Sequence, residues 1–139
     1  LLQNYPKAQK ATRIISSDSH TVMQASDAIL VASGTATLEA ALFKRPMVVG
    51  YSMPGLTGIF MQKKGIIDFV SLPNILAGRR LVPEILQYYC RSETLAYALW
   101  HEYQRRNDSE LIESFTQMHE SLLRDTPKLA AEAIQKVCG

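Results

Sequence analysis

The chain has 139 residues, 47% of them hydrophobic, and a formal net charge of +2. This size and composition fit a single globular domain with a proper core. The small net charge gives no case for nucleic-acid binding, and no apolar run approaches the roughly 18 residues of a membrane span. We expect no signal peptide at the start. The two cysteines, Cys90 and Cys138, are far apart and lack metal-ligand spacing, which favours a reduced, cytoplasmic protein.

The first elements alternate between strand and helix. Residues 13–16 are expected to form a short strand, and residues 17–19 offer N-cap side chains for a helix over residues 20–26. Residues 28–32 are apolar throughout rather than alternating. Such a strand is typical of a parallel sheet that is covered on both faces.

The alternation continues through the middle of the chain. A helix over residues 35–43 stops before Pro46, which cannot continue it. A strand over residues 47–51, a helix over 58–64 and a fourth strand over 69–72 follow. Short connections and right-handed crossovers then predict a doubly wound, Rossmann-like parallel sheet of the α/β class.

The last part of the chain has helical patterns only. Helices are expected over residues 83–89, 92–104, 108–123 and 127–137. Residues 1–90 are therefore expected to form the sheet, and residues 91–139 the flanking helices and a helical C-terminal tail.

A short loop follows the strand at residues 28–32. Ser33, Gly34, Thr35 and Thr37 lie where this strand ends and a helix begins, and the N–H groups of such a helix end can bind phosphate. Glu39 comes about one turn later, where a carboxylate could accept hydrogen bonds from a ribose diol. An ordinary capped turn with a solvent-facing Glu is the alternative interpretation.

A second polar segment, residues 71–78, follows the strand expected at 69–72. Ligands of open α/β sheets gather at that edge, and the Asn74 amide offers a donor and an acceptor. The alternative is a turn Asn that bonds its own backbone. His20 lies where a loop enters a helix, so it could contact a bound base.

Three basic pairs could attract phosphates or an anionic membrane surface. Each pair is also explained as a solvated helix end: Lys44-Arg45, Lys63-Lys64 and Arg79-Arg80. Apolar residues near the second pair would suit lipid if exposed and a core if buried: Leu56, Ile59, Phe60 and Met61.

Three blocks of the sequence resemble lipid-A-disaccharide synthases. They are residues 32–39 (ASGTATLE), 46–51 (PMVVGY) and 70–78 (VSLPNILAG), in the order and at the spacing of that family. Residues 25–28 also fit, so the resemblance covers roughly residues 12–90.

This resemblance implies the C-terminal domain of a GT-B glycosyltransferase. The family transfers 2,3-diacylglucosamine from UDP to 2,3-diacylglucosamine 1-phosphate, in lipid A biosynthesis on the way to lipopolysaccharide. The resemblance implies no cofactor and no metal, since the UDP-sugar is a substrate. Family members act as peripheral proteins at the cytoplasmic face of the inner membrane, and pair as homodimers through their C-terminal parts.

The resemblance also implies roles for individual residues. Ser33, Gly34, Thr35 and Thr37 would hold the UDP diphosphate, and Glu39 the ribose. Asn74 is carried over as a functional residue of the donor site.

The chain departs from the family in length. A full member has two Rossmann-like domains, whereas residues 1–139 correspond to a single UDP-binding domain. We expect the N-terminal acceptor domain and the general base to lie outside these 139 residues, so that this chain alone binds UDP and has little or no transferase activity.

Other functions remain open at this point. A GT-B N-acetylglucosaminyltransferase of peptidoglycan synthesis shares a small-residue loop followed by Glu. A non-catalytic Rossmann-like domain and a flavodoxin-like or receiver domain are further alternatives, although a receiver would need an acidic cluster at its strand ends.

Overall fold

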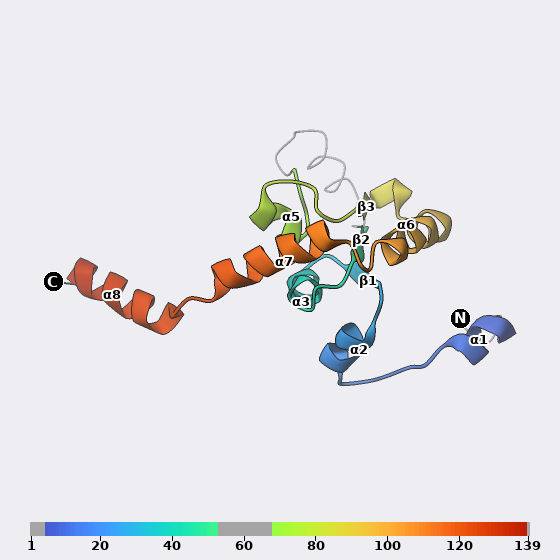
Figure 1. Ribbon diagram of the computed structural model, residues 1–139, viewed down its shortest axis with the longest axis horizontal. Helices are drawn as coiled ribbons and strands as arrows, with labels where there is room; N and C mark the ends of the chain where they lie inside the picture. Colours follow the sequence, from blue (N-terminus) through green and yellow to red (C-terminus); the bar gives the residue numbers. More distant parts are fainter. Residues whose placement is uncertain (1–4, 53–67, 139) are drawn as a thin grey trace.

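A small parallel sheet lies at the centre of the molecule. The computed structural model describes residues 5–52 and 68–138. The strands of this part of the chain are β1 (Ile29–Ala32), β2 (Met47–Tyr51) and β3 (Glu84–Leu86), in the order β1-β2-β3. Helices flank the sheet (Figure 1). The predicted class is confirmed: a Rossmann-like α/β fold with a parallel sheet between helices.

The middle strand, β2, is paired on both of its edges. Val49 is in register with Val31 of β1 and with Glu84 of β3. Partners in a parallel ladder share a face of the sheet, so these three side chains point to the same side. Met47, Val48 and Val49 are fully buried, which explains why β2 begins with an unbroken apolar run.

Within the described residues, three helices lie on the side of the sheet to which Val49 points. They are α3 (Thr35–Leu42), α5 (Leu72–Ala77) and α7 (Ser109–Leu122). The α3 helix packs on β1 and β2, and α7 packs on α3 and α5. Leu111, Phe115 and Met118 recur at helical spacing on α7 and join Val49 in the core.

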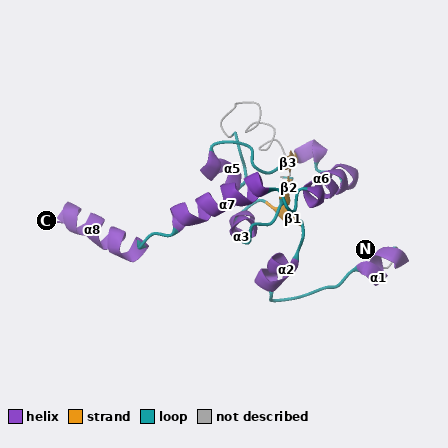
Figure 2. Ribbon diagram, in the orientation of Figure 1, coloured by secondary structure: helices purple, strands orange, loops and turns teal. Residues whose placement is uncertain are grey.

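The opposite face of the sheet is covered by α6 (Ser92–Gln104), which contacts β2 and β1. The approach is close at Gly50, where a Cβ atom would lie 3.2 Å from Leu95 Cδ2. A glycine at this position therefore lets the helix reach the sheet. Figure 2 shows the strands with helices on either side.

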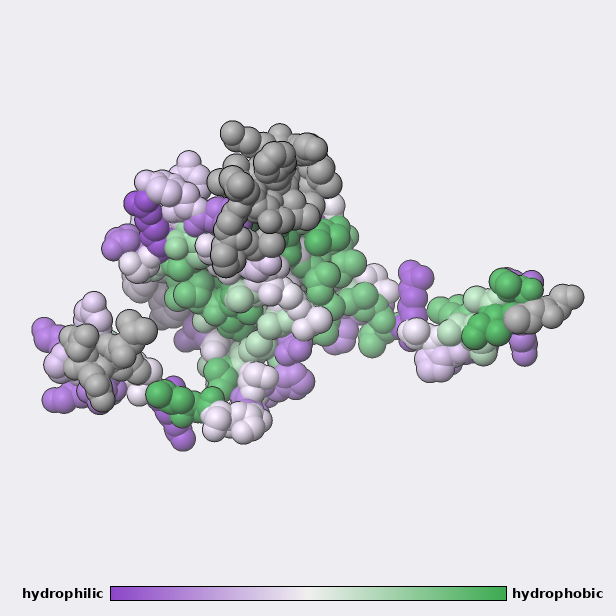
Figure 3. All heavy atoms as spheres, turned by 180° about the vertical axis from the view of Figure 1, so that it is seen from behind, coloured by the Kyte–Doolittle hydropathy of each residue, from purple (hydrophilic) through white to green (hydrophobic). Residues whose placement is uncertain are grey.

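The other helices of the described residues lie outside this sandwich of sheet and helices. They are α1 (Pro6–Ala11), α2 (Ser19–Ala25), the 3₁₀ helix η2 (Gln87–Tyr89) and α8 (Thr126–Cys138). The α8 helix projects from the domain, and its described side chains are exposed (Figure 1). Figure 3 shows hydrophobic residues gathered on this projecting helix.

Most of the predicted elements are confirmed to within one or two residues. Those confirmed are the helices expected over residues 20–26, 35–43, 92–104, 108–123 and 127–137 and the strands expected over 28–32 and 47–51. Asp18, one of the three N-cap candidates at residues 17–19, caps α2, because its side chain accepts a hydrogen bond from Thr21 N–H. The helix expected over residues 58–64 lies outside the described residues.

Two predicted strands are wrong. Residues 13–16 are exposed coil, and no described strand pairs with them, although Ile14 and Ile15 suit a strand by type. Residues 69–71 form a bend leading into α5, with Ser71 as N-cap and Pro73 at the helix start. Proline is favoured in the first turn of a helix, so Pro73 fits a helix start better than a strand end.

The helix expected over residues 83–89 is also wrong. Residues 84–86 form β3, and residues 87–89 form η2. The free edge of β2 decides this, because Val49 N–H bonds to Pro83 O and the ladder continues to Leu86. Tertiary pairing outweighs the weak helical signal of a proline followed by an acid.

Candidate functional site

A tight loop joins the end of β1 to the start of α3. Gly34 is the N-cap residue of α3 and has φ +132° and ψ −164°, a conformation open essentially to glycine alone. A Cβ atom built on Gly34 would meet nothing within 4 Å, and Thr35 beside it is exposed. The start of α3 is therefore open to a ligand.

The first N–H groups of α3 point out of this open loop end. Within the described part of the chain, the N–H groups of Thr35 and Ala36 have no hydrogen-bond partner, whereas Thr37 N–H bonds to Gly34 O at 3.1 Å. Free N–H groups at a helix start carry a partial positive charge. This end of α3 can therefore accept an anion such as phosphate.

The bend at residues 69–71 lies beside the β1–α3 loop. Ser33 Oγ donates to Val70 O at 2.8 Å, and Leu72 N–H donates to Thr37 Oγ1 at 3.3 Å. These two bonds join the two polar segments that the sequence singles out. The buried Thr37 hydroxyl also donates to Gly34 O at 2.7 Å, so it holds the loop in shape.

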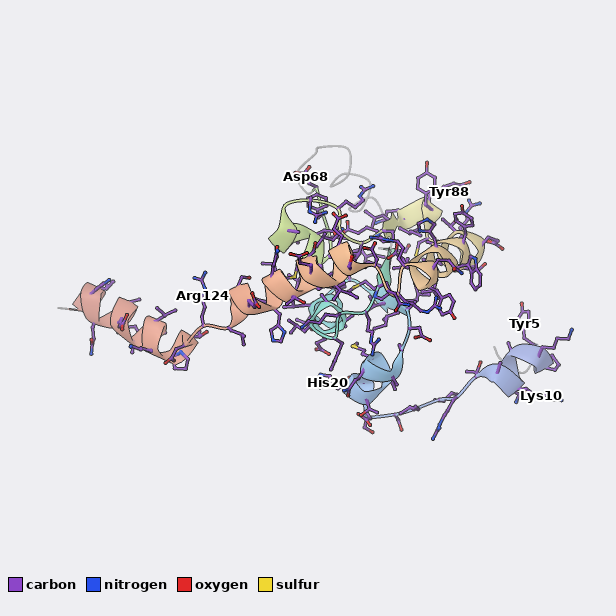
Figure 4. The ribbon with its side chains drawn as sticks, viewed as in Figure 1. Tyr5, Lys10, His20, Asp68, Tyr88 and Arg124 are labelled. Atoms are coloured by element: carbon purple, nitrogen blue, oxygen red, sulfur yellow. The ribbon has the colours of Figure 1, made fainter. Side chains whose placement is uncertain are left out.

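Glu39 has a different neighbour. Its Oε2 lies 3.3 Å from His20 Nε2 on α2, and the side chain is 38% exposed. The His20 ring packs edge-on against Phe43, with 5.7 Å between the ring centroids. The structure thus brings two predicted site residues, Glu39 of α3 and His20 of α2, together. Figure 4 shows His20 on α2.

Asn74 is fully buried, and both the oxygen and the nitrogen of its side-chain amide make hydrogen bonds. Its Oδ1 accepts from Leu81 N–H at 2.7 Å and Val82 N–H at 3.0 Å. Its Nδ2 donates to Val82 O and to Glu84 Oε1, both at 2.9 Å. These bonds use the two donors and two acceptor sites of an amide. Asn74 therefore holds the turn between α5 and β3.

Glu84 is the residue of this region that sequence reasoning misses. Its carboxylate accepts from Val70 N–H, from Ser71 N–H and Oγ, and from Asn74 Nδ2. In the sequence it resembles an ordinary acid in the first turn of a helix. Its place would follow only from recognising residues 84–86 as a strand in register with Val49.

The basic pairs have different environments. Lys44 Nζ bonds to Leu42 O and to His119 Nδ1, and Arg45 donates to Gln24 O, so this pair joins α3 to α7 and α2. Arg79 and Arg80 are exposed, and Arg79 bonds Ser114. The third pair and the four apolar residues near it lie outside the described residues.

Among the described residues, no group of three or more His, Cys, Asp or Glu is arranged to hold a metal ion. None of the described helices is both long and apolar enough to cross a bilayer. The absence of a cofactor stays a prediction.

The parallel sheet, with its glycine loop and helix start at the carboxyl edge, is of the kind found in the C-terminal domain of GT-B glycosyltransferases. A sequence profile of the lipid-A-disaccharide synthetase family matches residues 2–134, and the chain belongs to this family. The match favours this family over the peptidoglycan N-acetylglucosaminyltransferase that the sequence analysis leaves open.

Individual relatives agree with the profile. The lipid-A-disaccharide synthase of Burkholderia vietnamiensis is 50% identical over 132 residues, which cover 93% of this chain and 33% of the relative. That of Aliivibrio fischeri is 48% identical over 124 residues, or 89% of this chain and 32% of the relative. The chain spans about one third of the length of these curated relatives.

Proposed function

We propose that this chain is the UDP-binding part of a lipid-A-disaccharide synthase. The complete enzyme would transfer 2,3-diacylglucosamine from UDP to 2,3-diacylglucosamine 1-phosphate and release UDP. These 139 residues alone would bind the nucleotide without appreciable transfer, because they span only about one third of the length of the curated relatives. Family membership and the loop at the start of α3 support this proposal.

The diphosphate would lie against the loop of residues 33–37. Breaking the bond between the sugar and the diphosphate leaves growing negative charge on the β-phosphate of UDP. The free N–H groups of Thr35 and Ala36, together with the Thr35 hydroxyl, would stabilise that charge. Gly34 would let the diphosphate approach the backbone, and Ser33 and Thr37 would keep the loop in shape through their bonds to Val70 and Leu72.

Glu39 would accept hydrogen bonds from the ribose hydroxyls. Its carboxylate is partly exposed and has one described partner, His20, which is itself exposed. A ribose diol could therefore replace or share that contact. Asn74 would act in the donor site through the turn it holds, since its own amide groups are all engaged.

The partners of the complete enzyme follow from the same proposal. Acyl chains on the sugar donor UDP-2,3-diacylglucosamine and on the acceptor require it to work at a membrane, as a peripheral protein on the cytoplasmic face of the inner membrane. Arg79 and Arg80 are exposed cations that could approach an anionic surface. The projecting apolar face of α8 suits the pairing of two copies.

Isothermal titration of UDP into the 139-residue chain tests the nucleotide proposal. We expect binding that Glu39→Ala weakens at least about tenfold, because a hydrogen bond to a charged group is worth about 1.5–3 kcal/mol, or roughly 10- to 150-fold in affinity. Thr35→Ala should weaken it less, since the backbone donors remain. Glu120→Ala, at an exposed position of α7, is the control and should bind as the wild type does. No binding, or equal binding by all variants, would contradict the proposal.

A further inference from the structure

Glu84 gathers hydrogen bonds from one short segment of chain. Val70 N–H lies 3.2 Å from Oε1 and 3.1 Å from Oε2. Ser71 donates to Oε1 twice, from its N–H at 2.8 Å and from its Oγ at 2.6 Å. Asn74 Nδ2 completes the set at 2.9 Å. One carboxylate thus receives four donors from the bend at 69–71 and the start of α5.

The same segment contacts the loop at the start of α3. Val70 gives its N–H to Glu84 and its carbonyl to Ser33 Oγ. Leu72, the next residue after Ser71, donates to Thr37 Oγ1. Glu84 therefore bonds the residue that accepts from Ser33 and the residue next to the one that donates to Thr37.

The register of the sheet brings Glu84 to this place. It is paired with Val49, which is paired with Val31 one strand further on. The loop of residues 33–37 begins two residues after Val31. Glu84 thus points to the α3 side of the sheet, where its carboxylate bonds Val70, Ser71 and Asn74.

The contacts suit a carboxylate. All four partners are donors, and an ionised carboxylate is an acceptor at both oxygens. A glutamine of the same shape would turn an NH₂ group toward Val70 N–H in either orientation of its amide, because Val70 N–H contacts both oxygens. A donor left facing a donor in a partly buried place is destabilising.

We propose that Glu84 is a positioning residue of the nucleotide site. Its carboxylate holds the 70–72 segment in the position from which that segment fixes Ser33 and Thr37, and thereby the diphosphate loop. This inference rests on the proposed function. Because the segment bonds Ser33 and Thr37 of the diphosphate loop, the effect of Glu84 on a nucleotide is expected to act on the β-phosphate and to spare the nucleoside end.

The test compares Glu84→Gln with Glu102→Gln in the 139-residue chain. Glu102 is a matched control, because it is a buried carboxylate that pairs with Arg105 within the α6 region. For Glu84→Gln we expect UDP affinity to fall about tenfold and UMP affinity to fall less than threefold, so that the preference for UDP shrinks. Glu102→Gln should keep the wild-type ratio of the two affinities.

Amide hydrogen exchange separates this inference from the proposed function. Glu84→Gln should speed exchange at Val70, Ser71 and Leu72, and Glu102→Gln should not. Unchanged exchange at these amides would overturn the positioning role, whatever UDP does. Faster exchange with an unchanged ratio of UDP to UMP affinity would overturn the link to the site. A wild-type chain that binds no UDP would overturn the proposed function and, with it, the role of Glu84 in nucleotide binding. That result would hold even if hydrogen exchange showed that Glu84 orders residues 70–72.

Discussion

At the scale of single residues, two buried polar side chains fix the loops of the candidate site. Asn74 and Thr37 are both fully buried, and both have their hydrogen-bonding groups engaged by neighbouring loops. Leaving such groups unpaired would cost about 1–3 kcal/mol each. Their contacts therefore explain the shape of the site, while the groups left free for a ligand are the backbone N–H groups and the exposed Thr35.

Asp108 offers a test of a single charged residue by pH. Hydrogen bonds from Leu111 N–H and from the Arg105 side chain hold the pKa of Asp108 below its ordinary value. A lowered carboxyl pKa contributes stability that is present above the unfolded pKa of about 4 and is lost as the pH falls through the folded pKa. Asp108→Ala should thus melt a few degrees lower than the wild type at pH 6, because α7 loses its N-cap.

The difference between the two melting temperatures should shrink as the pH is lowered from 6 to 2. The control is Asp27→Ala, at an exposed residue that makes no hydrogen bond within the described part of the chain. A difference that stays constant down to pH 2 would contradict the role given to the Asp108 charge.

At the scale of elements, α7 holds the helical layer together. Its apolar stripe packs on α3 and α5, and the loops of the candidate site lead directly into those two helices. The packing of α7 is therefore coupled to the place where residues 33 and 70 meet, although α7 itself lies outside the site.

Two leucines of α7 test this layer with the same substitution. Leu111 is 3% exposed and Leu122 is 41% exposed. Leu111→Ala should lower the free energy of unfolding by about 2–5 kcal/mol, and Leu122→Ala by less than about 1 kcal/mol, because only the first leaves a cavity. Urea denaturation measures both. Equal losses would mean that α7 does not pack on α3 and α5 as described.

The elements also show what sequence patterns predict and where they fail. Strong periodicity predicts α6 and α7, and the unbroken apolar runs predict β1 and β2. The three-residue β3 has no such pattern, since its position depends on the free edge of β2. Predicting residues 84–86 as helix also leaves Glu84 out of the predicted site, because its position there follows from a strand register.

The site itself divides in the same way. The helix start at Thr35 is predicted from local signals: an apolar run, a glycine and a run of helix formers. The contact of Glu39 with His20 and the engagement of Asn74 by Leu81 and Val82 depend on distant parts of the chain. The spacing of residues along the sequence does not predict such contacts between distant segments.

At the scale of the whole molecule, the described chain has a packed centre and a projecting end. The centre is the sheet with α3, α5, α6 and α7, and the end is α8. Leu129, Ile134 and Val137 are exposed on α8. An exposed amphipathic helix gains stability from an apolar partner surface, and a second copy of the chain is the partner that we propose.

Removal of residues 126–139 tests that pairing. We expect the 139-residue chain to sediment as a dimer and the shortened chain as a monomer in analytical ultracentrifugation. The urea midpoint of the shortened chain should stay that of a folded centre, since α8 contributes nothing to the core. A shortened chain that still dimerises would place the pairing surface elsewhere.

The most direct test of the central claim is an NMR titration of the chain with UDP. If the amides at the start of α3 bind the diphosphate, the largest shift changes should fall on Gly34, Thr35 and Ala36, with smaller ones at Val70 and Ser71. Shift changes confined to other parts of the molecule, or no changes at saturating UDP, would contradict the account.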